Sequence, residues 1–245
     1  MRAALGGGVK GGLWGMRAIE LAPNVYRLDL GRYQAYVWRE GERATLIDTG
    51  EPGSGPLIEA ALGEIGLTRA ALDRVVLTHF HDDHAGSAAE VASWGAPVVA
   101  GAADAPVIAG AAEGPEPNFT EFERELHAQV AAGLEPAPPV AVDVAVRDGD
   151  VLAFGAEGAR VVATPGHTDG SVALYLPAEE VLFTGDIAAH FNGDVILGVF
   201  NLDAGVAAES FRRLAALDTR LACFGHGDPV TDAGGRLRAT ADGLA

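Results

Sequence analysis

Three histidines and two aspartates lie within the six consecutive positions 79–84, just after the apolar residues 75–77. Neutral imidazole and carboxylate groups are the ligands that zinc prefers, and iron and manganese also bind them. If the chain leaves a strand in an extended form, residues i and i+2 point the same way, so His79 and His81 can bind one metal ion together. Asp83 and His84 then begin the next helix and face a second position nearby. The alternative is a chance cluster of surface histidines, which the spacing disfavours.

Two metal ions need more ligands than these four. The rest of the chain supplies further candidates. Each candidate directly follows an apolar run that is typical of a strand, so the edge of a sheet is expected to hold it. The three candidates are His167 after residues 161–166, Asp186 after residues 181–185 and His226 after residues 221–225.

The complete pattern resembles the metallo-β-lactamase-fold hydrolase superfamily. It consists of His-x-His-x-Asp-His, then Thr-Pro-Gly-His, then Thr-Gly-Asp and finally Gly-His-Gly, all in order between residues 48 and 226. The resemblance implies an α/β fold, a four-layer αββα sandwich, with a two-metal site at one edge. It also implies how the ligands are shared: His79, His81 and His167 for one metal, Asp83, His84 and His226 for the other, with Asp186 as the bridge.

Two aspartates near the motif have alternative interpretations. Asp48 lies in an Asp-Thr-Gly stretch that recurs in this superfamily, where it would accept a hydrogen bond from a ligand imidazole. The alternative is a simple turn aspartate. Asp82 lies between the ligands, and a charge at a helix N-terminus is favoured over a ligand role. Cys223, the single cysteine of the chain, is expected to be a buried and inert thiol.

Departures from better-known branches of the superfamily narrow the expected function. True metallo-β-lactamases do not use an aspartate bridge at the position of Asp186. Glyoxalase II carries a C-terminal helical domain, and it shares with persulfide dioxygenases a Gly-Cys-Gly-Arg-like stretch that residues 187–193 lack. Small lactonases and esterases of the fold keep all seven ligands in a chain of this size. Within a glyoxalase II and lactonase-like branch, and not among the true β-lactamases, the resemblance to these small enzymes therefore fits best.

The expected function is hydrolysis of a small ester, lactone or thioester by a hydroxide held between two metal ions. Two Zn²⁺ per chain are expected, with Mn²⁺ or Fe²⁺ as alternatives. Asp83 is the candidate catalytic residue, because it would orient the hydroxide and pass a proton to the leaving group. Two other functions remain open: a mononuclear iron dioxygenase acting on a sulfur substrate, and a non-catalytic metal-binding module.

Composition limits the classes of partner. The chain has 245 residues, a hydrophobic fraction of 49% and a formal charge of −17. This charge disfavours nucleic acid and anionic membrane as partners, so a small-molecule substrate is expected. A cytoplasmic location is expected because no segment has the pattern of a signal peptide or of a membrane span. Residues 16–245 are predicted to form a single domain, and residues 1–15 a mobile extension. The sequence leaves the oligomeric state open.

Hydrophobic periodicity predicts the elements that must position the ligands. The predicted strands cover residues 24–30, 35–38, 44–47, 74–78, 97–100, 140–147, 151–154, 160–163, 171–176 and 181–184. The predicted helices cover residues 53–66, 83–94, 119–132 and 204–217.

Residues 102–139 interrupt this rhythm and are predicted to be an insertion over the active site. Its helix carries a stripe made of Phe119, Phe122 and Leu126. Packing on the core is the favoured interpretation of that stripe, with a wall of the substrate pocket as the alternative. His127 in the same helix is expected to face solvent.

The connection at residues 187–201 follows Asp186 and therefore starts close to the metals. It carries His190, Phe191 and Phe200, which are the candidate substrate-binding residues. For His190 a solvated loop position is the favoured alternative. Apolar walls suit a neutral acyl chain or ring better than a phosphate.

Overall fold

The computed structural model describes residues 17–244, so the predicted extension at residues 1–15 lies outside the described residues. The first sheet has the strand order β1-β2-β3-β4-β5-β6-β7, antiparallel up to β4 and parallel from β4 onward. Its strands are β1 (Ala18–Ala22), β2 (Val25–Asp29), β3 (Gln34–Glu40), β4 (Arg43–Ile47), β5 (Leu72–Leu77), β6 (Val98–Gly101) and β7 (Val144–Val146).

The second sheet has the order β15-β14-β11-β10-β9-β8, and its one parallel pair is β11 with β14. Its strands are β8 (Val151–Leu152), β9 (Ala159–Ala163), β10 (Val172–Leu176), β11 (Val181–Phe183), β14 (Leu221–Cys223) and β15 (Val230–Thr231). A separate hairpin pairs β12 (Ala188–Phe191) with β13 (Asp194–Leu197).

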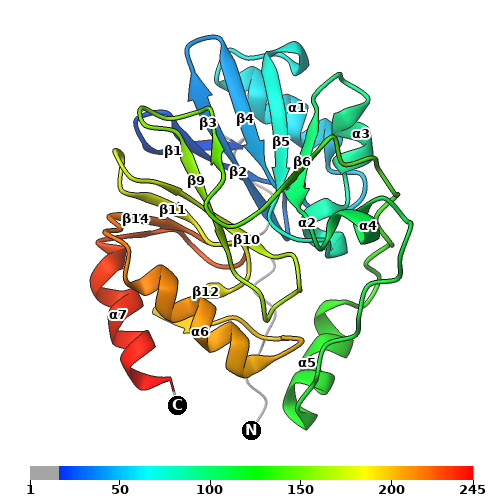
Figure 1. Cartoon of the computed structure of the whole chain (residues 1–245). Coiled ribbons are helices and arrows are strands. Elements are labelled where there is room, and N and C mark those ends of the chain that lie inside the picture. Colours follow the sequence, from blue (N-terminus) through cyan, green and yellow to red (C-terminus); the bar gives the residue numbers. More distant parts are fainter. Residues whose placement is uncertain (1–16, 245) are drawn as a thin grey trace, which may run out of the picture.

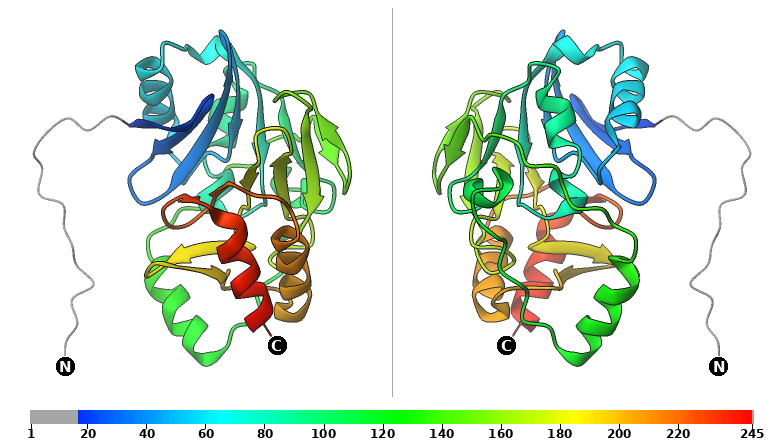
Figure 2. Two further views of the ribbon diagram at one scale, coloured as in Figure 1. Left: turned by 90° about the vertical axis from the view of Figure 1, so that its left-hand side faces the viewer. Right: turned by 90° about the vertical axis from the view of Figure 1, so that its right-hand side faces the viewer.

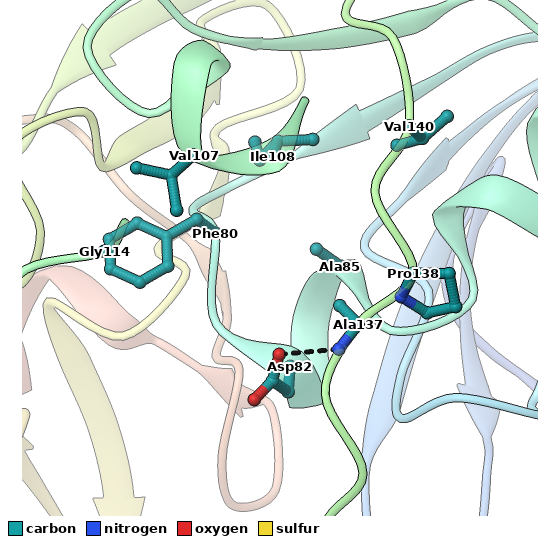
Figure 3. Close-up of a pocket in the computed structure, with 9 residues that line it drawn as sticks. All are labelled: Phe80, Asp82, Ala85, Val107, Ile108, Gly114, Ala137, Pro138 and Val140. Atoms are coloured by element: carbon teal, nitrogen blue, oxygen red, sulfur yellow. Dashed lines mark hydrogen bonds between the residues drawn. The ribbon is translucent and has the colours of Figure 1, made fainter. Parts of the chain in front are cut away.

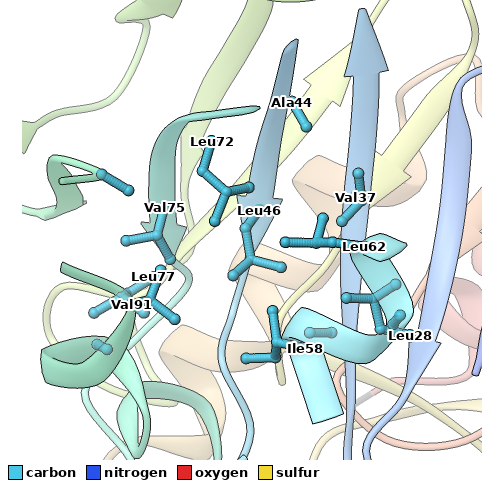
Figure 4. Packing of buried hydrophobic residues seen from close by; sticks show 14 of the residues in the cluster. Leu28, Val37, Ala44, Leu46, Ile58, Leu62, Leu72, Val75, Leu77 and Val91 are labelled. Carbon is cyan, nitrogen blue, oxygen red and sulfur yellow. The ribbon is translucent and has the colours of Figure 1, made fainter. Parts of the chain in front are cut away.

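Helices cover the outer face of each sheet (Figure 1). Helices α1 (Gly55–Glu64) and α3 (Ala88–Ala92) pack on the first sheet, and α6 (Ala204–Ala215) and α7 (Ala233–Gly243) pack on the second. Figure 4 shows the first of these packings, where Ile58 and Leu62 of α1 meet Leu46 of β4. A further core fills the space between the two sheets. The predicted αββα sandwich is confirmed.

Alternation of side chains explains why both sheets are buried on both faces. In β5, Val75 and Leu77 point to the helices, whereas Val76 points to the other sheet. In β10, Leu174 belongs to the core between the sheets and Ala173 to the core under α6 and α7. Each such buried aliphatic side chain contributes about 1.5–3 kcal/mol, so the strand ends that carry the ligands rest on a rigid support.

Several predicted boundaries were wrong. The helix predicted at 83–94 is split into α2 (Asp82–Ala85) and α3, because Gly86 and Ser87 pass close to the chain at 49–54. A Cβ on Gly86 would lie 2.4 Å from the nitrogen of Pro52, and Ser87 N donates to Thr49 Oγ1. The strand predicted at 140–147 is reduced to β7. The connection at 187–201 contains the β12–β13 hairpin, and strands β1 and β15, the 3-10 turn η1 (Arg69–Ala71) and helix α7 were not predicted.

The segment at 102–139 forms two short helices, α4 (Ala105–Ile108) and α5 (Glu121–Val130). The favoured interpretation of its apolar stripe was wrong: α5 buries no residue, and Phe122 is 71% exposed. Figures 1 and 2 show α5 standing away from both sheets. His127 does not simply face solvent, because its ring packs on Phe119 and Phe200. Within residues 17–244, no helix has the length and apolar character needed to cross a membrane.

Candidate metal centre

The candidate ligands all follow the carboxyl ends of strands, where the edges of the two sheets meet. Residues 79–84 follow β5 of the first sheet, and His167, Asp186 and His226 follow β9, β11 and β14 of the second. Strands β11 and β14 are parallel and in register, with Phe183 opposite Cys223, so Asp186 and His226 emerge at the same level. The two sheets are joined here by a hydrogen bond of 2.9 Å from Val172 N to Thr78 O.

The first group of ligands consists of His79, His81 and His167, whose donor atoms all lie within 4.8 Å of one another. The Nδ1 atom of His81 lies 3.1 Å from the Nε2 atom of His167. Two nitrogens bound to one tetrahedral zinc ion would lie about 3.3 Å apart. Without a metal, one of these nitrogens must carry a proton and donate it to the other, and a metal cation replaces that proton.

The second group consists of Asp83, His84 and His226. The Nε2 atom of His226 lies 3.2 Å from Asp83 Oδ2, and the Nε2 atom of His84 lies 3.8 Å from the same oxygen. His84 is buried, whereas His226 is 43% exposed at its side chain. This group therefore forms the more open side of the site.

Asp186 stands between the two groups. Its Oδ1 lies 3.3 Å from His84 Nε2, and its Oδ2 lies 3.2 Å from His226 Nε2 and 3.8 Å from His167 Nε2. One carboxylate thus faces donors of both groups. A third possible group, made of His79, His84 and Asp186, links the other two.

Unpaired buried atoms indicate that the site is built for a cation. The Nε2 atoms of His79 and His84 and the Oδ1 atom of Asp186 are buried and have no hydrogen-bond partner among the described residues. Such atoms cost about 1–3 kcal/mol each unless something binds them. The chain also leaves room: a Cβ on Gly225 would lie 1.9 Å from Asp186 Oδ1 and 2.6 Å from His84 Cε1. The donor set, its spacing and these unpaired atoms all fit divalent metal ions.

Asp48 orients histidines of both groups. Its Oδ2 accepts hydrogen bonds from His84 Nδ1 at 2.9 Å and from the hydroxyl of Thr78 at 2.8 Å. Because that hydroxyl donates to Asp48, it accepts from His79 Nδ1, 3.0 Å away. Both imidazoles are thereby held in the tautomer that leaves Nε2 free for a metal.

Asn201 orients the imidazole of His167, as Asp48 orients that of His84. Asn201 was not among the residues predicted for the site. Its Oδ1 lies 3.3 Å from His167 Nδ1, and its Nδ2 donates to Gly198 O at 2.7 Å. The second bond fixes which end of the amide faces the imidazole. The sequence signal for Asn201 was weak. Asn201 is only a polar residue two positions before Asp203, which caps α6.

Electrostatics divides the ligands into neutral and charged groups. Burial, helped by the neighbouring His167, lowers the pKa of His81 to about 3, and burial also holds the pKa of His79 well below its usual value. Burial would raise the pKa of Asp83, yet His84 and His226 hold it at about 2. Asp186 chiefly raises the pKa of His226, to about 10. In the metal-free site the second group therefore carries protons that a bound metal displaces.

The remaining candidate residues lie outside the ligand groups. Asp82 begins α2, and its Oδ1 accepts a hydrogen bond from Ala137 N at 2.7 Å. His190 lies on β12, where its ring stacks on Phe224 at 6.2 Å and its backbone N donates to His226 O. Phe191 is 61% exposed at the end of the hairpin.

Phe200 directs its ring toward the insertion, at 5.9 Å from Phe119 and 5.1 Å from His127. The structure thus gathers all seven candidate ligands and places the three candidate substrate-binding residues around them or against α5. Contact of His190, Phe191 and Phe200 with a substrate stays a prediction.

A cavity of about 260 Å³ is lined in part by residues of the segment that carries the metal motif (Figure 3). Phe80 and Asp82, which alternate with His79 and His81 along the chain, line it. The other lining residues come from α2 and from the segment after β6: Ala85, Val107, Ile108, Gly114, Ala137, Pro138 and Val140. None of the seven candidate ligands, all of which are described, lines this cavity.

Comparison with known sequences gives the family. The model described as "Metallo-beta-lactamase superfamily" matches residues 28–226, a range that contains Asp48 and all seven candidate ligands. A hydroxyacylglutathione hydrolase from Rhodobacter capsulatus is 32% identical over 209 residues, which cover 83% of this chain. The chain spans 64% of the length of that relative.

Two solved structures have a similar fold. A metallo-beta-lactamase family protein from Thermus thermophilus, TTHA1429, is 26% identical with a TM-score of 0.66, covering 91% of this chain and 80% of that one. TTHA1623, solved in a di-iron-bound form, is 28% identical with a TM-score of 0.64, covering 93% of this chain and 99% of that one. Since the family match extends over most of the chain and agrees with the observed layers, the chain belongs to the metallo-beta-lactamase superfamily.

Proposed function

We propose that the protein is a hydrolase that binds two metal ions and cleaves a small ester, lactone or thioester. The observation that carries this proposal is the position of Asp186. Its Oδ2 faces His167 of the first group and His226 of the second, and its Oδ1 faces His84 of the second group. A single carboxylate placed in this way suits a bridge between two cations, a typical arrangement of metal-dependent hydrolases.

The chain's own residues have separate roles in such a reaction. Two bound metal ions would lower the pKa of a water molecule toward neutrality and polarise the oxygen of the scissile group. Asp83 lies beside His226, which with His84 holds the pKa of Asp83 low, so its ionised carboxylate would accept a hydrogen bond from that water and orient it, and would relay the water's proton to the leaving atom. Asp48 and Asn201 hold the imidazoles of His84 and His167 in fixed tautomers throughout.

Charge and the relatives support the proposed substrate class. The formal charge of −17 disfavours a polyanionic substrate such as a nucleic acid. The relative from Rhodobacter capsulatus is named for hydrolysis of hydroxyacylglutathione, which is a thioester. Zinc is the proposed metal because most of the donors are imidazoles. Iron and manganese are the alternatives, and the di-iron form of TTHA1623 gives iron some support.

The test is a parallel assay of the metal-loaded protein. The protein is saturated with Zn²⁺, Mn²⁺ or Fe²⁺ and offered S-lactoylglutathione, a γ-lactone, p-nitrophenyl acetate and bis-p-nitrophenyl phosphate. We expect turnover of at least one carboxylic substrate, little turnover of the phosphodiester, and loss of this activity in Asp186→Ala. Glu59→Gln, at an exposed ion pair with Arg69, is the matched control that removes one carboxylate elsewhere and keeps full activity.

Two results would contradict the proposal. Oxygen consumption by the iron-loaded protein with glutathione persulfide, without hydrolysis of any ester, would assign the site to a dioxygenase. Absence of any turnover by protein with two bound metals per chain would leave a metal-binding module.

A further inference from the structure

Helix α5 is joined to the rest of the protein near its start by the carboxylate of Glu123 and at its end by Arg32, whose Nη2 donates to Val130 O at 2.8 Å. Thr120 caps the helix, and Glu123 completes the capping box by accepting from Thr120 N at 2.9 Å through its Oε2 atom. The other oxygen of Glu123, Oε1, accepts a hydrogen bond of 3.1 Å from the backbone N of Phe200. Glu123 therefore joins the start of α5 to the chain just before Asn201.

Further contacts support this connection. The backbone N of Asn118 donates to Asn201 O at 3.0 Å, and the ring of Phe200 packs between Phe119 and His127. The segment 118–127 thus surrounds Phe200 on several sides.

Phe200 adopts an unusual backbone conformation. Its φ of +62° lies in the left-handed region, which a residue with a large side chain occupies only where its surroundings compensate the steric cost. The backbone hydrogen bond to Glu123 and the contacts with Phe119 and His127 provide those surroundings. Without α5, residues 199–201 would relax toward an ordinary conformation.

The next residue, Asn201, connects this conformation to the metal centre. Its Oδ1 lies 3.3 Å from His167 Nδ1. The neighbouring backbone also follows His167, since Leu202 N donates to His167 O at 3.3 Å and Asp203 N to Gly166 O at 3.0 Å. A displacement of Phe200 therefore changes the partner that fixes the rotation and the tautomer of His167.

We propose that Glu123 is a positioning residue that acts on the metal ligand His167 through Phe200 and Asn201. The insertion helix thereby sets the metal affinity of the group formed by His79, His81 and His167. The effect on metal binding stands on the contacts alone, and the expected effect on catalytic rate rests on the proposed function. Loss of such an outer partner typically lowers metal affinity about 10–100-fold.

The experiment measures metal affinity without any substrate. Wild type and variants are titrated with Zn²⁺ in competition with a chromophoric chelator, which resolves two binding steps. We expect Glu123→Ala and Asn201→Leu each to weaken one step about 10–100-fold and to leave the other within about threefold. Glu123→Gln, whose amide oxygen still accepts from Phe200 N, restores most of the affinity. The Glu123 variants are expected to stay folded because α5 buries no residue, and circular dichroism checks the fold of Asn201→Leu, which replaces a buried amide by an apolar side chain of similar size.

Two comparisons separate positioning from a merely weakened helix. Thr120→Val removes the hydroxyl that caps the helix and donates to Glu123 Oε2, but the backbone N–H groups of Thr120 and Phe200 still donate to that carboxylate, so its zinc affinity should match wild type within about twofold. If Glu123 acts on His167 through Asn201, the double variant with Glu123→Ala and Asn201→Leu should bind zinc no more weakly than Asn201→Leu alone. Wild-type affinity in Glu123→Ala, equal losses in Thr120→Val, or fully additive losses in the double variant would overturn the proposal. Reduced zinc affinity in a protein that hydrolyses nothing would refute only the proposed function.

Discussion

The carboxylate of Asp48 lies 2.9 Å from Nδ1 of His84, and through the hydroxyl of Thr78 it also reaches Nδ1 of His79. One buried aspartate therefore sets the tautomers of a histidine in each ligand group. Asp48 has a left-handed backbone, with φ of +59°, which aspartate and asparagine tolerate better than other residues with side chains.

The relation between Asp48 and His84 predicts a difference between two substitutions. In Asp48→Asn the amide can donate to His84 Nδ1, which moves the imidazole proton to Nε2, the atom that must bind a metal. We expect a stable fold with metal affinity lowered about 10–100-fold. Asp48→Ala also leaves Thr78 N and His84 Nδ1 unpaired and should cost a further 1–3 kcal/mol or so per group in unfolding free energy. Zinc titration and urea denaturation measure the two effects. Equal metal affinity in Asp48→Asn and wild type would contradict this role.

A side chain at position 225 should disturb the metal centre by steric hindrance. Gly225→Ala would place a methyl group against Asp186 Oδ1 and His84 Cε1, so we expect loss of at least one metal per chain. Gly63→Ala in α1 is the matched control, because a Cβ there meets nothing within 4 Å. The control should keep its metals and gain up to about 1 kcal/mol of stability. Metal content measured by elemental analysis after gel filtration decides between the two. A fully loaded Gly225→Ala would show that the site tolerates a side chain at this position.

The buried carboxyl group of Asp104 should make the unfolding free energy depend on pH, and Asp104 is not one of the candidate metal ligands. Burial raises its pKa from 3.8 to about 6, although Thr168, Gly170 and Phe80 donate hydrogen bonds to it. Between these values the folded state binds more protons than the unfolded state, so the unfolding free energy decreases as the pH rises from about 4 to 6. The full effect is about 3 kcal/mol at most.

Asp104→Asn lacks this titration. The stability of wild type relative to Asp104→Asn should therefore be greatest near pH 4 and should decline up to pH 7, as measured by urea denaturation at several pH values. A constant difference across that range would mean that Asp104 has an ordinary pKa.

The aromatic side chains near the site predict separate effects on substrate binding. Phe191 is exposed at the end of β12, so we expect Phe191→Ala to raise KM for the best substrate and to leave metal content unchanged. Phe200→Ala should change both KM and zinc affinity, because the ring of Phe200 packs against α5. Steady-state kinetics and zinc titration separate the two variants. If Phe191→Ala matches wild type on every active substrate, the hairpin does not contact the substrate.

The candidate ligands could be picked out from the sequence because they are encoded locally, and the structure brings them together, while their binding of metal stays a prediction. Residues 79–84 form one dense motif, and each later ligand directly follows an apolar strand. Asn201 could not be found in this way, since its contact with His167 depends on how a distant loop returns to the site. The apolar stripe of α5 misled for a similar reason: periodicity shows that a face is apolar, but not what covers it.

One missed element did have a signal in the sequence. Asn192 and Gly193, with φ values of +51° and +90°, form the tight turn of the β12–β13 hairpin, and Asn-Gly is the strongest short hairpin signal. Helix α7 was harder to predict, because Gly234 and Gly235 lower its helix propensity. It forms because Ala233 and Leu237 are buried against the second sheet and α6.

The central claim is that the seven ligands bind two metal ions bridged by Asp186. Native mass spectrometry of the zinc-saturated protein after removal of free metal tests it most directly. We predict two zinc ions per chain in wild type and at most one in Asp186→Ala, with Glu59→Gln still binding two. One zinc ion or none in the wild-type protein, or two in Asp186→Ala, would contradict the claim.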